Sequence, residues 1–156
     1  MTEETNDYPG YDALTVCEEG EFSGWRYWRG DPFEGRAGPF YMRREDDGSY
    51  RSAFRTADHH MNGAGFIHGG CLMTFADFAL FSIATDALGA DQGVTMNLSS
   101  DFLGAAGPGA FIEARGEVTR GGGATKGKTI FVRGLVTADG APTLSFTGII
   151  RRLRKR

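Results

Sequence analysis

The hydrophobic pattern of the chain separates into one long apolar run and several segments in which apolar and polar residues alternate. The run covers residues 69–88, where nearly every side chain is apolar or small. Because it shows no clear polar face, the run predicts a helix that is buried on all sides. A single helix of this kind needs a sheet that wraps around it and a partner subunit on its remaining side.

The alternating segments predict an antiparallel sheet with one solvated face. Two strands precede the helix, joined by Asp47-Gly48, and three or four follow it, with a second Asp-Gly hairpin at Asp139-Gly140. The predicted strands are residues 39–45, 49–57, 94–103, 111–120, 129–138 and 143–153. This order predicts an α+β fold in which the strands after the helix form an antiparallel meander.

The chain has 156 residues, enough for one domain with a substantial core. Residues 38–156 carry the pattern described above and form the predicted domain. Residues 1–37 interleave aromatic residues with arginines, glycines and a proline, without a clear period. We expect this N-terminal extension to be a loop or short helix that packs on or flanks the core.

Composition excludes several classes of protein. The net charge of −3 gives no indication of nucleic acid or a membrane surface as partner. Of the two cysteines, Cys71 lies in the apolar run, so a secreted disulfide scaffold is not expected. The N-terminus lacks the pattern of a signal peptide, and Asp77 and Asp86 argue against a membrane span. We therefore expect a cytoplasmic protein.

Asp77 is the most informative residue, because it places a carboxylate in the middle of the apolar run. Buried carboxylates need compensation, so a structural role with hydroxyl or backbone donors and a functional role are both open. Upstream, His68-Gly69-Gly70 leaves free N–H groups at the helix start, where anions are favoured. A carboxylate and an oxyanion donor are the minimal parts of an acyl-transfer or proton-transfer site.

Two other patterns are weaker indications of binding sites. Residues 122–129 match the phosphate-loop pattern GxxxxGK[ST], but the β-branched residues from Thr129 onward predict a strand where that motif needs a helix. His59 and His60 lack the spaced carboxylates or cysteines of a metal site. We expect a glycine-rich hairpin at the first position, a solvent-exposed loop at the second, and no bound metal.

The pattern Asn62-x-x-Gly65-x-x-His68-Gly69-Gly70, followed by Asp77, strongly resembles that of the hotdog-fold acyl-CoA thioesterases of the PaaI (phenylacetate-pathway) type. The similarity extends from about residue 38 to 152 and includes Gly93-Val94-Thr95 at the start of a strand. Two features depart from the family: the long N-terminal extension, and Gly104, which stands where a proline is common. The resemblance implies an antiparallel sheet of five to six strands wrapped around one long central helix.

The resemblance also implies the reaction and the role of each residue. An acyl-CoA thioester would be hydrolysed to a free acid and coenzyme A, without a separate cofactor. Asp77 would be the general base or the nucleophile, and the Gly69 N–H would stabilise the carbonyl oxygen. Asn62 would orient the thioester or the water, His68 would support the loop and the thioester end, and Thr95 would hold the water. Family members are homodimers, often dimers of dimers, with sites at the dimer interface.

Helix geometry independently favours a site that two chains share. Gly69 and Asp77 are eight residues apart, which is about 12 Å along a helix. A donor and a base that act on one carbonyl must lie within about 3 Å of the reacting atoms. Two antiparallel helices across a two-fold axis can meet this condition. We therefore expect Gly69, Asn62 and His68 of one chain to meet Asp77 and Thr95 of its partner.

Residues that bind the rest of the substrate are predicted from their position and charge. The acyl group would lie near Met73, Phe75 and Phe78, with Gly70 as a further contact at the helix start. The residues expected to contact the phosphates of coenzyme A are Arg120, Lys126, Lys128 and Arg151. The sequence does not determine the acyl group, because a one-methylene difference is worth only about 1–3 kcal/mol.

Three other functions stay open from the sequence alone. A hotdog-fold enoyl-CoA hydratase would use a catalytic histidine, for which His68 is the candidate. An acyl-CoA binding protein would hold the thioester without turnover. A nucleotide-binding module would act through the glycine-lysine loop.

Overall fold

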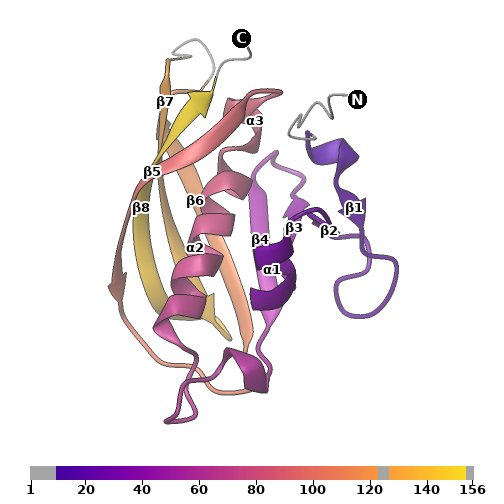
Figure 1. Cartoon of the computed structure of the whole chain (residues 1–156), viewed down its shortest axis with the longest axis vertical. Helices are drawn as coiled ribbons and strands as arrows, with labels where there is room; N and C mark the ends of the chain where they lie inside the picture. Colours follow the sequence, from indigo (N-terminus) through magenta and orange to yellow (C-terminus); the bar gives the residue numbers. More distant parts are fainter. Residues whose placement is uncertain (1–9, 123–126, 154–156) are drawn as a thin grey trace, which may run out of the picture.

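One antiparallel sheet contains every strand of the described residues, 10–122 and 127–153, of this computed structural model. Its eight strands follow the order β1-β2-β3-β4-β6-β7-β8-β5, and the sheet curves around helix α2 (Figure 1). The strands are β1 (Thr15–Val16), β2 (Arg26–Tyr27), β3 (Tyr41–Arg44), β4 (Tyr50–Arg55), β5 (Gln92–Phe102), β6 (Phe111–Arg120), β7 (Thr129–Ala138) and β8 (Ala141–Leu153). This confirms the predicted fold of an antiparallel sheet around one long helix.

The apolar run forms two helices rather than one. Helix α2 (Gly69–Ile83) ends before Ala84, and α3 (Thr85–Leu88) follows. The Thr85 hydroxyl donates to the backbone carbonyl of Ser82 at 2.7 Å, a side-chain bond that competes with the helical backbone pattern. Among the described residues, no helix is long and apolar enough to cross a membrane. The cytoplasmic location stays a prediction.

The sheet buries only one side of α2. Phe75, Ala76 and Leu80 are fully buried against it, whereas Asp77 on another face of the helix is half-buried. The sheet therefore covers one side of the helix, as predicted, and the partner subunit expected on the remaining side stays a prediction. One sheet can cover only one face of a helix, and the remaining face is left for other contacts.

The predicted meander is wrong for β5. This strand pairs with β8 and lies at the opposite end of the sheet order from β1, whereas β6 pairs with β4 and β7. The connection between β5 and β6 spans residues 103–110, longer than the two to five residues of a β-hairpin. It passes the start of α2, where the Ile67 N–H donates to the Ala106 carbonyl at 2.8 Å.

Both predicted Asp-Gly hairpins are confirmed. Gly48 has a φ of 82° in the turn between β3 and β4. Asp139 and Gly140 have φ values of 48° and 85°, the pair of positive angles that a two-residue type I′ hairpin requires. The turn residues therefore determine where these strands reverse.

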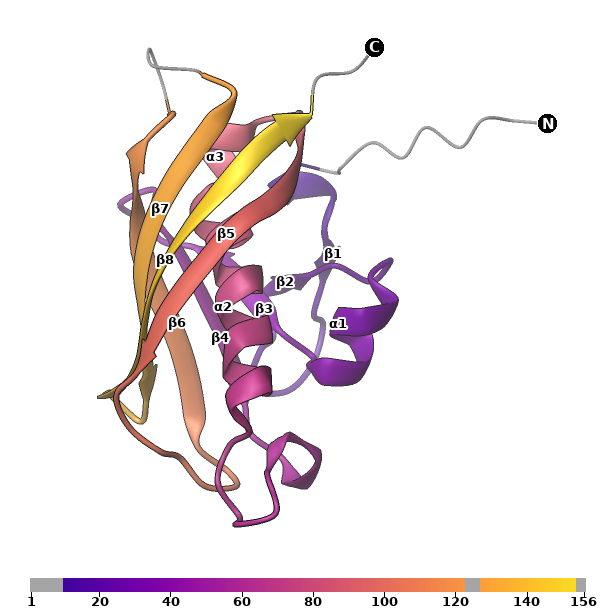
Figure 2. The same ribbon diagram turned by 60° about the vertical axis from the view of Figure 1, so that its left-hand side comes forward.

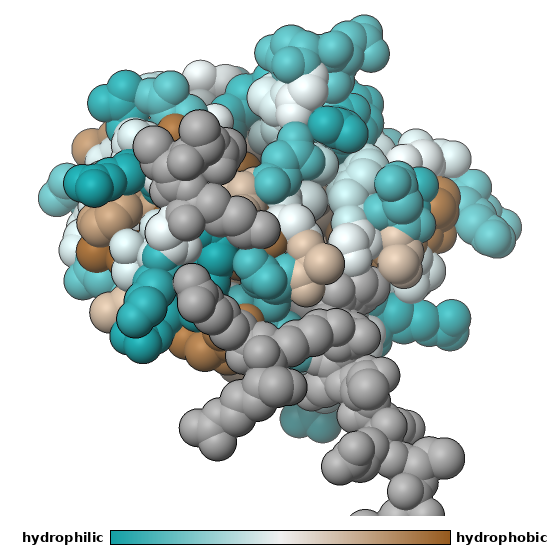
Figure 3. Space-filling view, turned by 90° about the horizontal axis from the view of Figure 1, so that it is seen from above, coloured by the Kyte–Doolittle hydropathy of each residue, from teal (hydrophilic) through white to brown (hydrophobic). Residues whose placement is uncertain are grey.

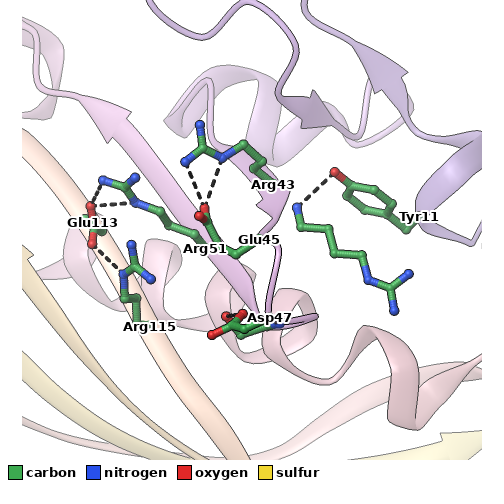
Figure 4. Close-up of polar contacts among 9 residues, drawn as sticks. Tyr11, Arg43, Glu45, Asp47, Arg51, Glu113 and Arg115 are labelled. Carbon is green, nitrogen blue, oxygen red and sulfur yellow. Dashed lines mark hydrogen bonds and ion pairs between the residues drawn. The ribbon is translucent and has the colours of Figure 1, made fainter.

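The N-terminal extension adds two short strands and a helix to the core. Strand β2 pairs with β3, and the Tyr11 hydroxyl accepts a hydrogen bond from the Arg44 N–H at 3.0 Å (Figure 4). Helix α1 (Pro32–Ala37) begins at an Asp31 cap followed by proline, a favoured helix start. It lies beside α2 in both ribbon views (Figures 1 and 2). The short helix was predicted, and the two strands were not.

Charged side chains connect β4 and β6 across the outer face of the sheet (Figure 4). Glu113 on β6 accepts from Arg51 Nε at 2.7 Å and from Arg115 Nε at 2.8 Å. Arg43 Nε donates to Glu45 at 3.0 Å. These pairs lie outside the core and outside the site described below.

Phe75 belongs to an aromatic cluster in the core. Its ring centroid lies 4.8 Å from that of Phe54 and 5.3 Å from that of Phe40. Replacing Phe75 with alanine is expected to lower the free energy of unfolding by about 3–5 kcal/mol, because it leaves a cavity among fully buried rings. Urea unfolding measures the loss. Phe33→Ala is the matched control, since that ring is 66% exposed, and equal losses in both variants would contradict the assignment.

Candidate functional site

The start of α2 presents one free backbone donor. His68 caps the helix, and its Nδ1 accepts from the Gly70 N–H at 2.8 Å, so the neutral ring carries its proton on Nε2. The Gly69 N–H, at the first helical position, donates to no acceptor within residues 10–122 and 127–153. An unsatisfied N–H at a helix start favours developing negative charge. Gly69 is therefore the candidate oxyanion donor, whereas the N–H of Gly70 is engaged by His68.

Asn62 organises the loop that leads into this helix. Its Oδ1 accepts from the N–H groups of Ala64 at 2.9 Å and Phe66 at 3.2 Å. Its side-chain NH₂ has no hydrogen-bond partner in the described part of the chain. The two N–H bonds of this amide are therefore available near the helix start, where they can orient a carbonyl or a water molecule.

The carboxylate of Asp77 is held by β5. The Thr95 hydroxyl donates to Asp77 Oδ1 at 2.6 Å, while Oδ2 has no hydrogen-bond partner among the described residues. An ionised carboxylate can accept at both oxygens, so Oδ2 is available to take a proton or to attack a carbonyl. The pairing of Asp77 with Thr95 agrees with the predicted position of both residues.

A single chain does not bring the two halves of this site together. Gly69 and Asp77 lie on one straight element, α2, at a separation of about 12 Å for eight residues. Asn62 and His68 are at the Gly69 end, and Thr95 is at the Asp77 end. The predicted catalytic residues thus form two groups, neither of which is complete.

Strand β5 supplies an edge through which two copies can associate. Among the described strands it pairs with β8 alone, so its other side offers unpaired backbone groups over eleven residues. Val94 is 44% exposed, and Met96 and Phe102 are each 56% exposed. A long, apolar, exposed edge strand is a template for pairing with another chain.

A cavity of about 320 Å³ opens beside Asp77. It lies between α2, the start of β5 and the N-terminal extension, and we call it the Asp77 cavity. It is lined by Leu14, Trp28, Asp31, Glu34, Met42, Asp77, Phe78, Phe81, Ser82, Gln92, Gly93, Val94 and Leu153. Of the residues predicted to contact the acyl group, Phe78 lines it, whereas Phe75 lies in the core and Met73 contacts Ser100 on β5.

Glu34 on α1 is a feature of the Asp77 cavity that the sequence did not reveal. Burial, together with the nearby carboxylates of Asp31 and Asp77, raises the pKa of this carboxyl to about 8. Glu34 therefore holds a proton at neutral pH. The Asp31-Pro32 pair is a sequence signal for the start of α1, but no local signal shows where the extension packs.

Three of the four predicted phosphate contacts gather at one end of the sheet. Arg120 ends β6, Lys128 precedes β7, and Arg151 pairs with Thr129 in β7 and Val94 in β5. Figure 3 shows this end of the molecule, where hydrophilic and intermediate residues predominate. Lys126 lies outside the described residues.

Of the two weaker motifs, the glycine-lysine pattern is followed by the predicted strand, whereas the histidine pair does not have the predicted structure. Thr129 begins β7, as predicted, so a strand rather than a helix follows the glycine-lysine pattern. His59 and His60 form a short 3-10 helix, η2 (Asp58–His60). The prediction of an exposed loop is wrong for His60, which is buried because its Nδ1 accepts from the Ala57 N–H at 2.8 Å and its ring packs on Phe54.

The part of the chain that contains Gly69 and Asp77 is similar to known proteins. The model of the family described as "Thioesterase superfamily" matches residues 64–141, which include Gly69, Asp77 and Thr95. The Pseudomonas aeruginosa protein named "Putative esterase PA0474" is 32% identical over 93 residues, covering 59% of this chain and 69% of that protein.

Solved structures share the fold over most of the chain. The TT0310 protein of Thermus thermophilus is 29% identical, with a TM-score of 0.65 over 79% of this chain and 98% of that one. A variant of the phenylacetic acid degradation protein PaaI of the same organism is 28% identical, with a TM-score of 0.64 over 79% and 100%. The BH2602 protein of Bacillus halodurans, solved with CoA, has a TM-score of 0.64 at 23% identity over 74% of each chain.

Proposed function

This chain belongs to the thioesterase superfamily, and we propose that it hydrolyses acyl-CoA thioesters to a free acid and coenzyme A. The observation that carries the proposal is the pair of groups that the fold leaves available. The Asp77 carboxylate is held by Thr95 at one oxygen only, and the Gly69 N–H has no acceptor among the described residues. The solved Bacillus halodurans neighbour contains CoA, which supports coenzyme A as the thiol part of the substrate.

The proposed reaction uses both groups at one carbonyl carbon. The carbonyl oxygen accepts from the Gly69 N–H, which stabilises the charge that develops there, with a contribution of about 3–4 kcal/mol in comparable sites. Asp77 Oδ2 either removes a proton from the attacking water or attacks the carbon itself. When Asp77 acts as a base, the bond from the water oxygen to the carbon forms, the carbon–sulfur bond breaks, and the thiolate takes the proton that Asp77 removed. When Asp77 attacks, an acyl–Asp77 anhydride forms as the thiolate leaves; water then hydrolyses the anhydride to the free acid and regenerates Asp77, and the proton released goes to the thiolate. Asn62 and Thr95 position the carbonyl and the water.

The proposed active unit is a homodimer with two composite sites. Two copies of β5 that pair antiparallel across a two-fold axis would place their α2 helices side by side, in opposite directions. The Gly69 end of one helix then meets the Asp77 region of the other. The apolar exposed edge of β5 supports this pairing. A dimer of dimers remains our expectation from the family resemblance.

The hydratase alternative has less support. It would need a histidine paired with a carboxylate, but His68 Nδ1 is occupied by the Gly70 N–H. No carboxylate in the described part of the chain contacts the ring, so a carboxylate could reach Nε2 only from the partner subunit. His68 is thus better suited to support the helix start.

Thiol release from a panel of acyl-CoAs tests the proposed function. The panel contains short, medium and long acyl chains together with phenylacetyl-CoA and hydroxybenzoyl-CoA. Turnover of at least one thioester is the expected result. Binding without thiol release across the panel would point to an acyl-CoA binding protein, and hydration of an enoyl-CoA would point to a hydratase.

A further inference from the structure

The Asp77 cavity is built partly by residues outside the family match. Leu14, Trp28, Asp31, Glu34 and Met42 all precede residue 64, where that match begins. Because Asp77 lines the same cavity, an acyl group whose carbonyl lies at Asp77 has this space beside it. An acyl group in this space would therefore contact the N-terminal extension of this chain.

The apolar walls suit a hydrocarbon chain or ring. Trp28, Phe78, Phe81 and Met42 contribute large apolar side chains. The volume of about 320 Å³ falls at the lower end of the range of ligand pockets, about 300–1,000 Å³. This space is large enough for an acyl group of small or medium size.

All the ionisable side chains that line the Asp77 cavity are acidic. They are the carboxyl groups of Asp31, Glu34 and Asp77, and none of the described lining residues is basic. Asp31 is already engaged, because its Oδ1 accepts from the N–H groups of Phe33 and Glu34 at the start of α1. Glu34 is therefore the carboxyl of the extension that remains available to a ligand.

Ser82 is a further polar residue beside the Asp77 cavity. This residue lines the Asp77 cavity, is 1% exposed, and its hydroxyl has no hydrogen-bond partner among the described residues. A buried hydroxyl without a partner costs free energy, but its oxygen has almost no accessible surface and is not exposed to a ligand in the cavity.

We propose that Glu34 is a specificity-determining residue of the acyl pocket, which admits acyl groups bearing a hydrogen-bond donor such as a hydroxyl and excludes those bearing a carboxylate. The inference rests on the proposed thioester hydrolysis. A hydroxyl can donate to the carboxyl oxygen of Glu34 in either protonation state. A carboxylate on the acyl group meets Glu34, Asp31 and Asp77 without a compensating cation in the lining.

The ionisation of Glu34 makes this selection depend on pH. Its pKa of about 8 means that the side chain is mainly neutral at pH 7 and mainly anionic at pH 9. The charged groups that face it are Asp31 at the start of its own helix and Asp77 on α2. Repulsion of an anionic acyl group therefore increases as pH rises through about 8.

Three thioesters of equal chain length test the proposal: hexanoyl-CoA, 6-hydroxyhexanoyl-CoA and adipyl-CoA. For the wild type, kcat/KM is expected to be at least about tenfold higher for 6-hydroxyhexanoyl-CoA than for adipyl-CoA, because the carboxylate of the adipyl group is repelled by the acidic lining. The ratio of kcat/KM for 6-hydroxyhexanoyl-CoA to kcat/KM for adipyl-CoA should rise from pH 7 to pH 9. Glu34→Gln should lower the ratio at pH 9, where Glu34 is anionic, and so remove its rise, and Glu34→Lys should favour adipyl-CoA.

Glu18→Gln is the matched control, since Glu18 is an exposed carboxylate of the same extension outside the Asp77 cavity. Its ratio and pH profile should equal those of the wild type. A ratio that is the same in the wild type and Glu34→Gln at both pH values would overturn the proposal. Failure of the wild type to hydrolyse any of these thioesters or any member of the acyl-CoA panel would instead overturn the proposed function. In that event, the relative dissociation constants of the three thioesters still test the role of Glu34.

Discussion

Replacing Asp77 with asparagine is expected to lower kcat for acyl-CoA hydrolysis by about 10²–10⁴-fold, the range for loss of a general acid or base. Asparagine has nearly the same shape, and its Oδ1 can still accept from the Thr95 hydroxyl. What it lacks is a carboxylate oxygen that can take a proton or attack the carbonyl carbon. Because Asp77 is half-buried at the cavity, the neutral side chain should not unfold the protein. Thiol release and urea unfolding measure the two effects.

Asp86→Asn is the matched control for this prediction. Asp86 lies on α3 and bonds with the Tyr50 hydroxyl at 2.8 Å and with Arg44 at 3.1 Å, outside the Asp77 cavity. It should keep wild-type kcat. An Asp77→Asn variant that is folded and retains wild-type kcat would contradict the catalytic role of Asp77.

Replacing Gly69 with proline is expected to lower kcat by about 10²–10³-fold, the effect of removing one oxyanion donor. Proline has no N–H, and the first position of a helix is where it is best tolerated. His68 already has φ −66° and ψ 132°, the extended conformation that a residue before proline requires. The helix should therefore form, and the far-ultraviolet circular dichroism spectrum should be that of the wild type.

Gly69→Ala separates loss of the donor from added bulk. A Cβ at this position would lie 3.3 Å from the Phe102 ring, so both variants introduce that contact, but alanine retains the N–H. We expect Gly69→Ala to keep most of the activity that Gly69→Pro loses. Equal losses in both variants would assign the effect to steric contact instead.

Local signals in the sequence predicted the helix and the hairpins correctly. An Asp-Gly pair specifies its turn through the positive φ angles of a few residues, so Asp139-Gly140 could be interpreted without knowledge of the rest of the chain. The position of β5 could not, because strand pairing depends on contacts between residues far apart in sequence. The alternation within residues 94–103 indicated a strand but not its neighbour.

In the candidate site too, local signals predicted some features, whereas features that depend on tertiary packing were missed. The motif from Asn62 to Asp77 gave the helix start and the carboxylate, and the structure places Thr95 against Asp77 as expected. The apolar run did not distinguish Phe75 in the core from Phe78 at the cavity, because the two residues have the same chemical character and differ only in the helix face they occupy. Glu34 was missed because its role depends on how the extension packs against α2.

Mixing two inactive variants tests the composite site most directly. In a heterodimer of Asp77→Asn and Gly69→Pro, one shared site combines both defects and the other has an intact Asp77 and an intact Gly69. If subunits exchange at random, half of the dimers are mixed and each has one working site, so about a quarter of wild-type activity should return. Absence of recovery, in a mixture where heterodimers are shown by mass spectrometry to have formed, would contradict a site shared between two chains.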